Sequence, residues 1–164
     1  TSSLSDITLP WLAQHVDAFY IGGTKVGAMF GEAVVFSNIK APRAFFTTVK
    51  RHGALLAKGR MLGIQFDTLF TDNLYLRVAR HANEMAERLR GIFISHGIQM
   101  GVDSPTNQQF VILTPQEKEQ LMESIAFEVW SPLPDGNILC RFVTSWATTE
   151  EDLLALDKAL AGLA

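Results

Sequence analysis

The chain has 164 residues, of which 48% are hydrophobic and 19% are charged, and this composition excludes a disordered tail, a collagen-like fibre and a coiled coil. A formal net charge of −3 provides no basic excess for binding a nucleic-acid backbone. The single cysteine, Cys140, excludes an internal disulfide and predicts a reducing, cytoplasmic location. No apolar run is long enough for a membrane span, and residues 1–6 lack the basic start of a signal peptide.

The first predicted elements are a short helix and two strands. Asp6 or Thr8 is expected to cap the helix. Residues 16–21 and 32–36 are predicted strands, and the glycine-rich residues 22–27 form the turn between them. Because residues 32–36 are nearly all apolar, we expect this second strand to be buried on both faces.

Helical spacing of apolar residues begins after Pro42. The clearest helix is expected to start at a cap provided by Asp72 or Asn73 and to stop at Gly97. Apolar residues recur along one face of this helix at the spacing of an amphipathic helix.

After Gly101 the pattern predicts a strand, a helix, two strands and a final helix. Capping boxes are expected to open the two helices, at Thr114 with Glu117 and at Thr148 with Glu151. The three predicted strands are residues 109–113, 127–130 and 138–144. We therefore divide the chain into residues 1–98 and a small α+β domain, residues 99–164. Since a strand buried on both faces needs two neighbours, chain outside these residues is expected to complete the first part.

Lys25 is the first candidate for chemistry, because it is the only lysine or arginine in residues 1–39 and lies in a glycine-flanked turn. A buried lysine loses its charge more easily, and a neutral amine can form a Schiff base with a carbonyl, as in pyridoxal phosphate chemistry. Thr24 can offer a hydroxyl and Gly23 a backbone N–H to a phosphate. The alternative is a solvated lysine in an ordinary hairpin turn.

Arg141 is the second candidate, because its predicted strand is otherwise apolar. A guanidinium in such a strand needs a partner, and its planar fork matches a carboxylate. A clamp for a substrate carboxylate, a structural salt bridge and a solvated edge position are all open readings of the residues. The basic residues 50–52 and 58–60, with Arg60, can reach an anion or can form a solvated helix face. The histidines show no metal-ligand spacing.

Residues 17–33, which contain the sequence Gly-Gly-Thr-Lys, resemble the cofactor-lysine segment of low-specificity L-threonine aldolases. These enzymes belong to the threonine aldolase and aromatic amino acid β-eliminating lyase group, which depends on pyridoxal 5′-phosphate (PLP). Residues 51–60 and 141–146 resemble two further segments of the family, in the same order. The resemblance extends over essentially the whole chain.

The resemblance implies an α/β fold of the aspartate-aminotransferase type, of which this chain would be the C-terminal half. Residues 1–98 would end the large PLP-binding domain, and residues 99–164 would form the small domain. Lys25 would carry the cofactor as a Schiff base, with Thr24 and Gly23 near its phosphate. Arg141, and Arg60 across a subunit interface, would bind substrate.

The implied activity is that of an aldehyde-lyase, which cleaves L-threonine and related β-hydroxy-α-amino acids to glycine and an aldehyde. The implied assembly is a homodimer or homotetramer, and the fragment by itself would be inactive. Two alternatives remain open: a β-eliminating lyase or aminotransferase with the same cofactor, and a non-catalytic oligomerisation domain.

Overall fold

The computed structural model describes residues 7–163, and the chain divides into two compact units, residues 1–78 and 79–164. The dividing point lies within the longest helix, α4 (Leu74–Ser95). The sequence predicts a boundary near residue 98, which is just beyond the end of the same helix. The assignment of the two parts to a large cofactor domain and a small domain stays a prediction.

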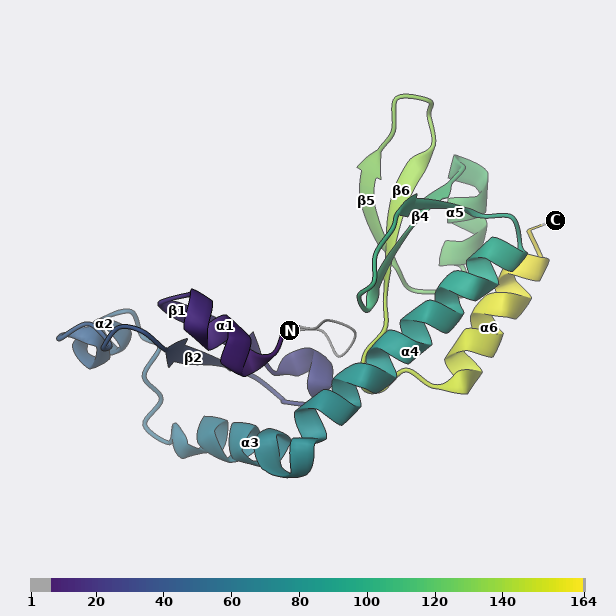
Figure 1. The fold of residues 1–164 in the computed structure, drawn as a ribbon. Helices are drawn as coiled ribbons and strands as arrows, with labels where there is room; N and C mark the ends of the chain where they lie inside the picture. The colour runs from purple at the N-terminus through teal and green to yellow at the C-terminus, as the bar shows by residue number, and fades with distance from the viewer. Residues whose placement is uncertain (1–6, 164) are drawn as a thin grey trace. The chain divides into compact units, whose positions relative to one another are not determined.

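The first unit is a two-stranded hairpin accompanied by short helices (Figure 1). Strands β1 and β2 pair antiparallel, with Ala18 opposite Phe36 and Gly22 opposite Glu32. Each strand coincides with a predicted one to within two residues. The elements of this unit are α1 (Leu9–His15), β1 (Ala18–Gly22), η1 (Thr24–Val26), β2 (Glu32–Phe36), α2 (Phe45–Arg51), α3 (Arg60–Phe70), η2 (Thr71–Asn73) and the first turn of α4.

Capping explains where α1 begins, and backbone strain explains where α3 gives way to α4. The Thr8 side chain accepts a hydrogen bond from the Trp11 backbone N–H at 3.2 Å, so Thr8 is the cap, while the alternative Asp6 lies outside the described residues. Asp72 and Asn73 were predicted as caps of α4 but instead adopt left-handed backbone angles, with φ of 51° and 56°. Asp and Asn tolerate this conformation best among non-glycine residues, so they form the bend between the helices.

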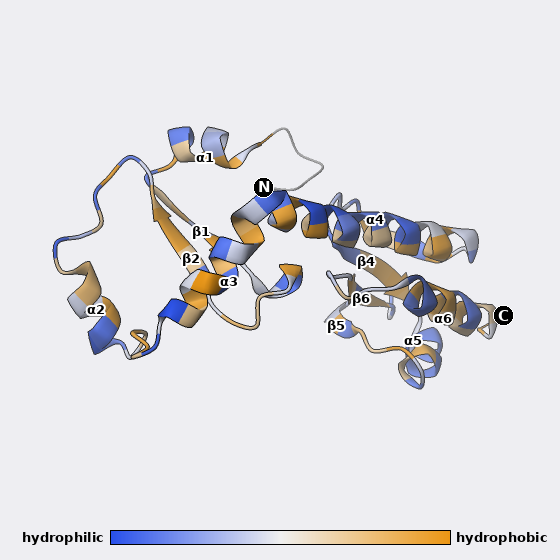
Figure 2. Ribbon diagram, turned by 90° about the horizontal axis from the view of Figure 1, so that it is seen from below, coloured by the Kyte–Doolittle hydropathy of each residue, from blue (hydrophilic) through white to orange (hydrophobic). Residues whose placement is uncertain are grey.

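Strand β2 is not buried on both faces within residues 7–163, so the burial predicted from its apolar sequence is not reached in the described chain. The strand is hydrophobic along most of its length (Figure 2), yet the Val34 side chain is 56% exposed. Within residues 7–163, β2 is hydrogen-bonded to β1 alone. Part of the apolar surface of β2 is therefore left exposed by the described residues.

The second unit is a four-stranded antiparallel sheet in the order β3-β4-β6-β5, with helices against it (Figure 1). Strand β3 was not predicted, because its residues Gln99–Val102 include a glycine and do not alternate cleanly. The other strands agree with the predicted ones to within two residues. The elements are β3 (Gln99–Val102), β4 (Gln108–Leu113), α5 (Pro115–Met122), β5 (Glu128–Pro132), β6 (Ile138–Val143) and α6 (Glu150–Ala161).

The core of the second unit lies between one face of this sheet and the helices α4 and α6. Alternate residues of β4 and β6 are buried, as the period of a strand requires. A salt bridge joins Arg88 of α4 to Glu150 of α6, and the ring of His96, just after α4, forms a hydrogen bond with Asp157 of α6. The core residues are Met85, Leu89, Phe93, Val111, Leu113, Leu121, Cys140, Phe142, Leu153, Leu156 and Leu160.

The two capping boxes differ in how well they were predicted. At α5 the Thr114 side chain and the Glu117 carboxylate bond reciprocally to backbone N–H groups, as expected. At α6 the box is formed by Thr149 and Asp152, one residue later than the predicted pair. Thr148 cannot serve because its hydroxyl accepts a hydrogen bond from the Ser145 backbone N–H at 2.9 Å. Across residues 7–163, no helix is both long and apolar enough to cross a membrane.

Candidate functional site

The turn that carries Lys25 is a single 3₁₀ turn, η1, between the two strands of the hairpin. The Gly23 carbonyl accepts hydrogen bonds from the N–H groups of Val26, at 3.1 Å, and Ala28, at 2.9 Å. Gly27 closes the turn at φ 98°, which glycine adopts without strain. Short local hydrogen bonds therefore fix the conformation of this segment.

Burial divides the turn into an inner and an outer side. Gly23, Val26 and Ala28 are buried, whereas Thr24 and Lys25 are exposed. A side chain at Gly23 is excluded, because its Cβ would lie 2.7 Å from the Cβ of Ala28. The turn thus exposes the neighbouring Thr24 hydroxyl and Lys25 amine, while buried residues and short hydrogen bonds hold its backbone. In the described chain Lys25 is exposed, so the burial expected from its sequence is not observed there.

Two residues that sequence reasoning missed, both distant along the chain, form hydrogen bonds with this turn and its flanks. The Tyr75 hydroxyl donates a hydrogen bond to the Gly22 carbonyl at 2.9 Å, and burial raises the pKa of this phenol. The Gln65 side chain accepts from the Met29 N–H at 2.6 Å. Because both residues lie far along the chain from the turn, no local pattern could have found them.

Arg60 is the first residue of α3 and its side chain is exposed. It lies in the same unit as Lys25, on a helix whose Gln65 holds the segment that follows the turn. The role of Arg60 in binding a ligand across a subunit interface stays a prediction.

Arg141 has partners within its own sheet, and one of them is a carboxylate. Its Nη2 donates to Glu128 in a salt bridge, and its Nη1 donates to the Gln108 amide oxygen at 3.0 Å. The guanidinium carbon lies 4.6 Å from the centre of the Trp130 ring. Of the alternatives raised by the sequence, a salt bridge within the protein is thus present in this structure.

The face of β6 that carries Arg141 is opposite the core. The adjacent Cys140 is fully buried, as predicted for a core residue, and burial raises the pKa of its thiol. The Arg141 side chain is 20% exposed and its Nε is buried without a hydrogen-bond partner among residues 7–163. Arg141 therefore keeps one buried donor that no acceptor within residues 7–163 satisfies.

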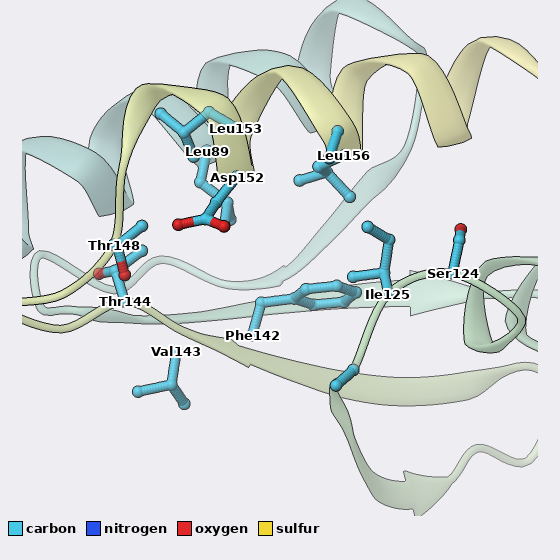
Figure 3. A pocket seen from close by; sticks show the side chains of 12 residues that line it. Leu89, Ser124, Ile125, Phe142, Val143, Thr144, Thr148, Asp152, Leu153 and Leu156 are labelled. Carbon is cyan, nitrogen blue, oxygen red and sulfur yellow. The ribbon is translucent and has the colours of Figure 1, made fainter.

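A separate cavity of about 340 Å³ lies in the second unit, between α6 and β6 (Figure 3). Apolar side chains such as Phe142 and Ile125 and polar ones such as Thr148 line it together. Asp152 reaches its rim, and hydrogen bonds from the Thr149 backbone and side chain lower the pKa of this carboxyl. None of the predicted site residues lines this cavity.

The structure brings together three of the predicted site residues. Gly23, Thr24 and Lys25 share one turn, and Arg60 belongs to the same compact unit. Arg141 belongs to the other unit, where Glu128, Gln108 and Trp130 surround it. The sequence had indicated the arginine but none of its three partners, because contacts between strands depend on their register.

Comparison with curated proteins gives the same relatives as the sequence motifs, although no family model matches the chain. The chain is 32% identical over 144 residues to a low specificity L-threonine aldolase of Pseudomonas sp. strain NCIMB 10558. This match covers 87% of this chain and 40% of that protein. It is 30% identical over 155 residues to the protein of the same name from Pseudomonas aeruginosa, covering 94% of this chain and 44% of that protein. The chain thus spans less than half the length of these relatives.

Comparison with solved structures identifies the fold. A threonine aldolase of Leishmania major matches with a TM-score of 0.92 and 38% identity, over 99% of this chain and 47% of the solved chain. A serine palmitoyltransferase of Sphingomonas wittichii matches with a TM-score of 0.64 at 16% identity, a likeness of fold alone. The predicted PLP-dependent, aspartate-aminotransferase-like fold class is therefore confirmed, and this chain is similar over nearly its whole length to the low specificity L-threonine aldolases.

Proposed function

We propose that the complete protein containing this chain is a PLP-dependent lyase that cleaves L-threonine and similar β-hydroxy-α-amino acids to glycine and an aldehyde. The observation that carries the proposal is Lys25, exposed on a glycine-flanked turn in a chain whose fold matches a threonine aldolase with a TM-score of 0.92. The curated proteins with this name match 87% and 94% of this chain.

The residues of the turn fit the cofactor. The exposed Lys25 amine is suited to hold an aldehyde, and the adjacent Thr24 hydroxyl is suited to donate to a phosphate. No heavy atom lies within 4 Å of a Cβ built on Gly22, so a flat ring can approach the backbone at the end of β1. When bound, PLP withdraws electrons from the substrate Cα and so allows the Cα–Cβ bond to break.

The chain's own residues have separate tasks in this proposal. Lys25 would hold the cofactor aldehyde through its uncharged Nζ amine, with water as the leaving group, and would take the place of the amino group again when glycine leaves. Arg141 binds the substrate carboxylate through its guanidinium and thereby sets the orientation of the bonds at Cα. Arg60 is proposed to approach substrate from a second subunit.

Self-association into a dimer or tetramer is part of the same proposal. Tyr20, Met29, Val34 and Phe46 are exposed apolar side chains of the first unit, and large apolar surfaces are typical of contacts with further chain. We also propose a cytoplasmic location, on the grounds of the single buried thiol. The 164-residue chain alone is expected to be inactive, because the resemblance assigns other cofactor ligands to residues outside it.

The test is replacement of Lys25 in the complete protein. Lys25→Ala is expected to abolish aldehyde release from threonine, because no other amine of the turn can hold the cofactor. Borohydride reduction followed by peptide mapping should place the pyridoxyl label on Lys25 in the unmodified protein and remove it in the variant. Lys40→Ala, at another exposed lysine of the same unit, is the control and should keep both properties.

Two results would contradict the proposal. A label on another lysine, or aldehyde release by Lys25→Ala at the rate of the unmodified protein, would remove Lys25 from the reaction. Formation of a keto acid in place of glycine would assign the protein to β-elimination or transamination, since only aldol cleavage yields glycine and an aldehyde.

A further inference from the structure

Three side chains hold the Arg141 guanidinium on the open face of the sheet, and the register of the strands explains why they meet there. Glu128 of β5 lies directly opposite Arg141 of β6, so their side chains share one face at close range. Gln108 lies on the other side, in β4, diagonally across from Arg141. The Trp130 ring, also from β5, contacts the guanidinium on this face.

A β-bulge further distinguishes Trp130. Val129 pairs with Cys140 and Ser131 pairs with Leu139, which leaves Trp130 without an opposite residue. Bulges redirect side chains and are common beside functional sites. Here the ring lies 4.6 Å from the guanidinium carbon and meets Phe110 edge-on, with ring centres 5.5 Å apart. The indole thus forms a fixed surface under the cation.

The partners of Arg141 differ in how firmly they are held. The Arg141 side chain is only 20% exposed, whereas the Glu128 side chain is 60% exposed. An exposed carboxylate regains its hydration when it moves away, so breaking such a pair costs little. A half-buried guanidinium left without any anion, in contrast, is destabilised. Glu128 is therefore the member of this group that can leave when another carboxylate arrives.

We propose that Glu128 is a built-in competitor for carboxylate ligands at Arg141, displaced by the ligand's own carboxylate, while Gln108 and Trp130 are positioning residues that keep the guanidinium in place. This inference rests on the proposed function, because it describes how the substrate carboxylate reaches Arg141. Glu128 neutralises the cation in the empty site and lowers the affinity for every carboxylate ligand. It also favours ligands that carry a carboxylate over amino alcohols, because a neutral group cannot replace the lost ion pair.

The experiment compares acetate binding by the complete protein and its Glu128→Gln variant. Glutamine keeps the shape and the acceptor of the side chain but removes its charge. Acetate is titrated at constant ionic strength against chloride, and the Nε–Hε resonance of Arg141 is followed by NMR. Glu128→Gln is expected to bind acetate about 1.4- to 5-fold more tightly, which is the range expected for release from one partly exposed ion pair. Unchanged or weaker binding overturns the proposal.

Further variants separate competition from a purely structural role. Glu119→Gln removes the same charge from an exposed residue of α5 that pairs with Lys118 and should leave acetate affinity unchanged. Glu128→Asp keeps the charge and should bind acetate as weakly as the unmodified protein. If Glu128 only stabilised the sheet, Glu128→Gln would lower stability without tightening acetate binding, and that result also refutes the proposal.

Kinetics add a second readout that depends on the proposed function. Glu128→Gln is expected to lower the KM for threonine by a similar factor and to leave kcat nearly unchanged, because ligand binding alone becomes easier. A raised KM refutes the inference. If the protein does not cleave threonine at all, the proposed function fails, while the acetate titration still decides whether Glu128 competes at Arg141.

Discussion

Replacement of Gly23 by alanine tests whether the turn beneath Lys25 is closely packed. A Cβ at this position would lie 2.7 Å from the Ala28 Cβ and 3.2 Å from Phe66 Cζ. The first distance is well below van der Waals contact, and Ala28 has no flexible side chain with which to move aside. Overpacking of this kind costs about 1–3 kcal/mol, so we expect the hairpin to open more readily.

Hydrogen exchange measured by mass spectrometry is the appropriate assay, because it reports opening of individual segments. In the complete protein, Gly23→Ala should accelerate exchange in peptides covering β1 and β2 by roughly 5- to 150-fold, which corresponds to about 1–3 kcal/mol. Peptides from β4 and β6, in the other compact unit, should exchange as before.

Two further variants make the test specific. Gly22→Ala is the matched control, because nothing lies within 4 Å of its Cβ, and it should leave exchange in the hairpin nearly unchanged. The double variant Gly23→Ala/Ala28→Gly removes the 2.7 Å contact and should restore most of the protection. If Gly23→Ala exchanges like the unmodified protein, or if the double variant is no better protected than Gly23→Ala, the packing argument is wrong.

Two further predictions concern the hydrogen bonds of Tyr75 and Asp152. Tyr75→Phe removes the bond to the Gly22 carbonyl and should destabilise the hairpin by about 0.5–1.5 kcal/mol, seen as faster exchange in β1 and β2; unchanged exchange would show that the bond contributes nothing. Hydrogen bonds from Thr149 hold the pKa of Asp152 below its ordinary range, so ionised Asp152 stabilises the folded state above the unfolded-state pKa. This contribution is lost as the pH falls through the lower folded-state pKa. Urea unfolding should therefore find a larger stability advantage of the unmodified protein over Asp152→Asn at pH 6 than at pH 2. An equal advantage at the two pH values would contradict this assignment.

The local features of this protein could be predicted because each depends on residues close together in the sequence. The cap at Thr8, the capping box at Thr114 and the stop at Gly97, whose φ is 75°, involve neighbouring residues only. The error at α6, where Thr149 replaces Thr148, arose because two adjacent threonines offer the same pattern. In the structure the Thr148 hydroxyl accepts from the Ser145 N–H, three residues earlier, while Thr149 caps the helix.

By itself, the sequence determined the Gly-Gly-Thr-Lys turn with its candidate Lys25, an arginine within an apolar strand, and the resemblance to threonine aldolases. Tertiary structure decided what surrounds these groups: the Tyr75 hydroxyl at Gly22, 53 positions away, and Glu128, Gln108 and Trp130 around Arg141. The physical reason is that cross-strand contacts depend on register, order and bulges. These are set by packing of the whole sheet against α4 and α6, and no short stretch of sequence contains that information.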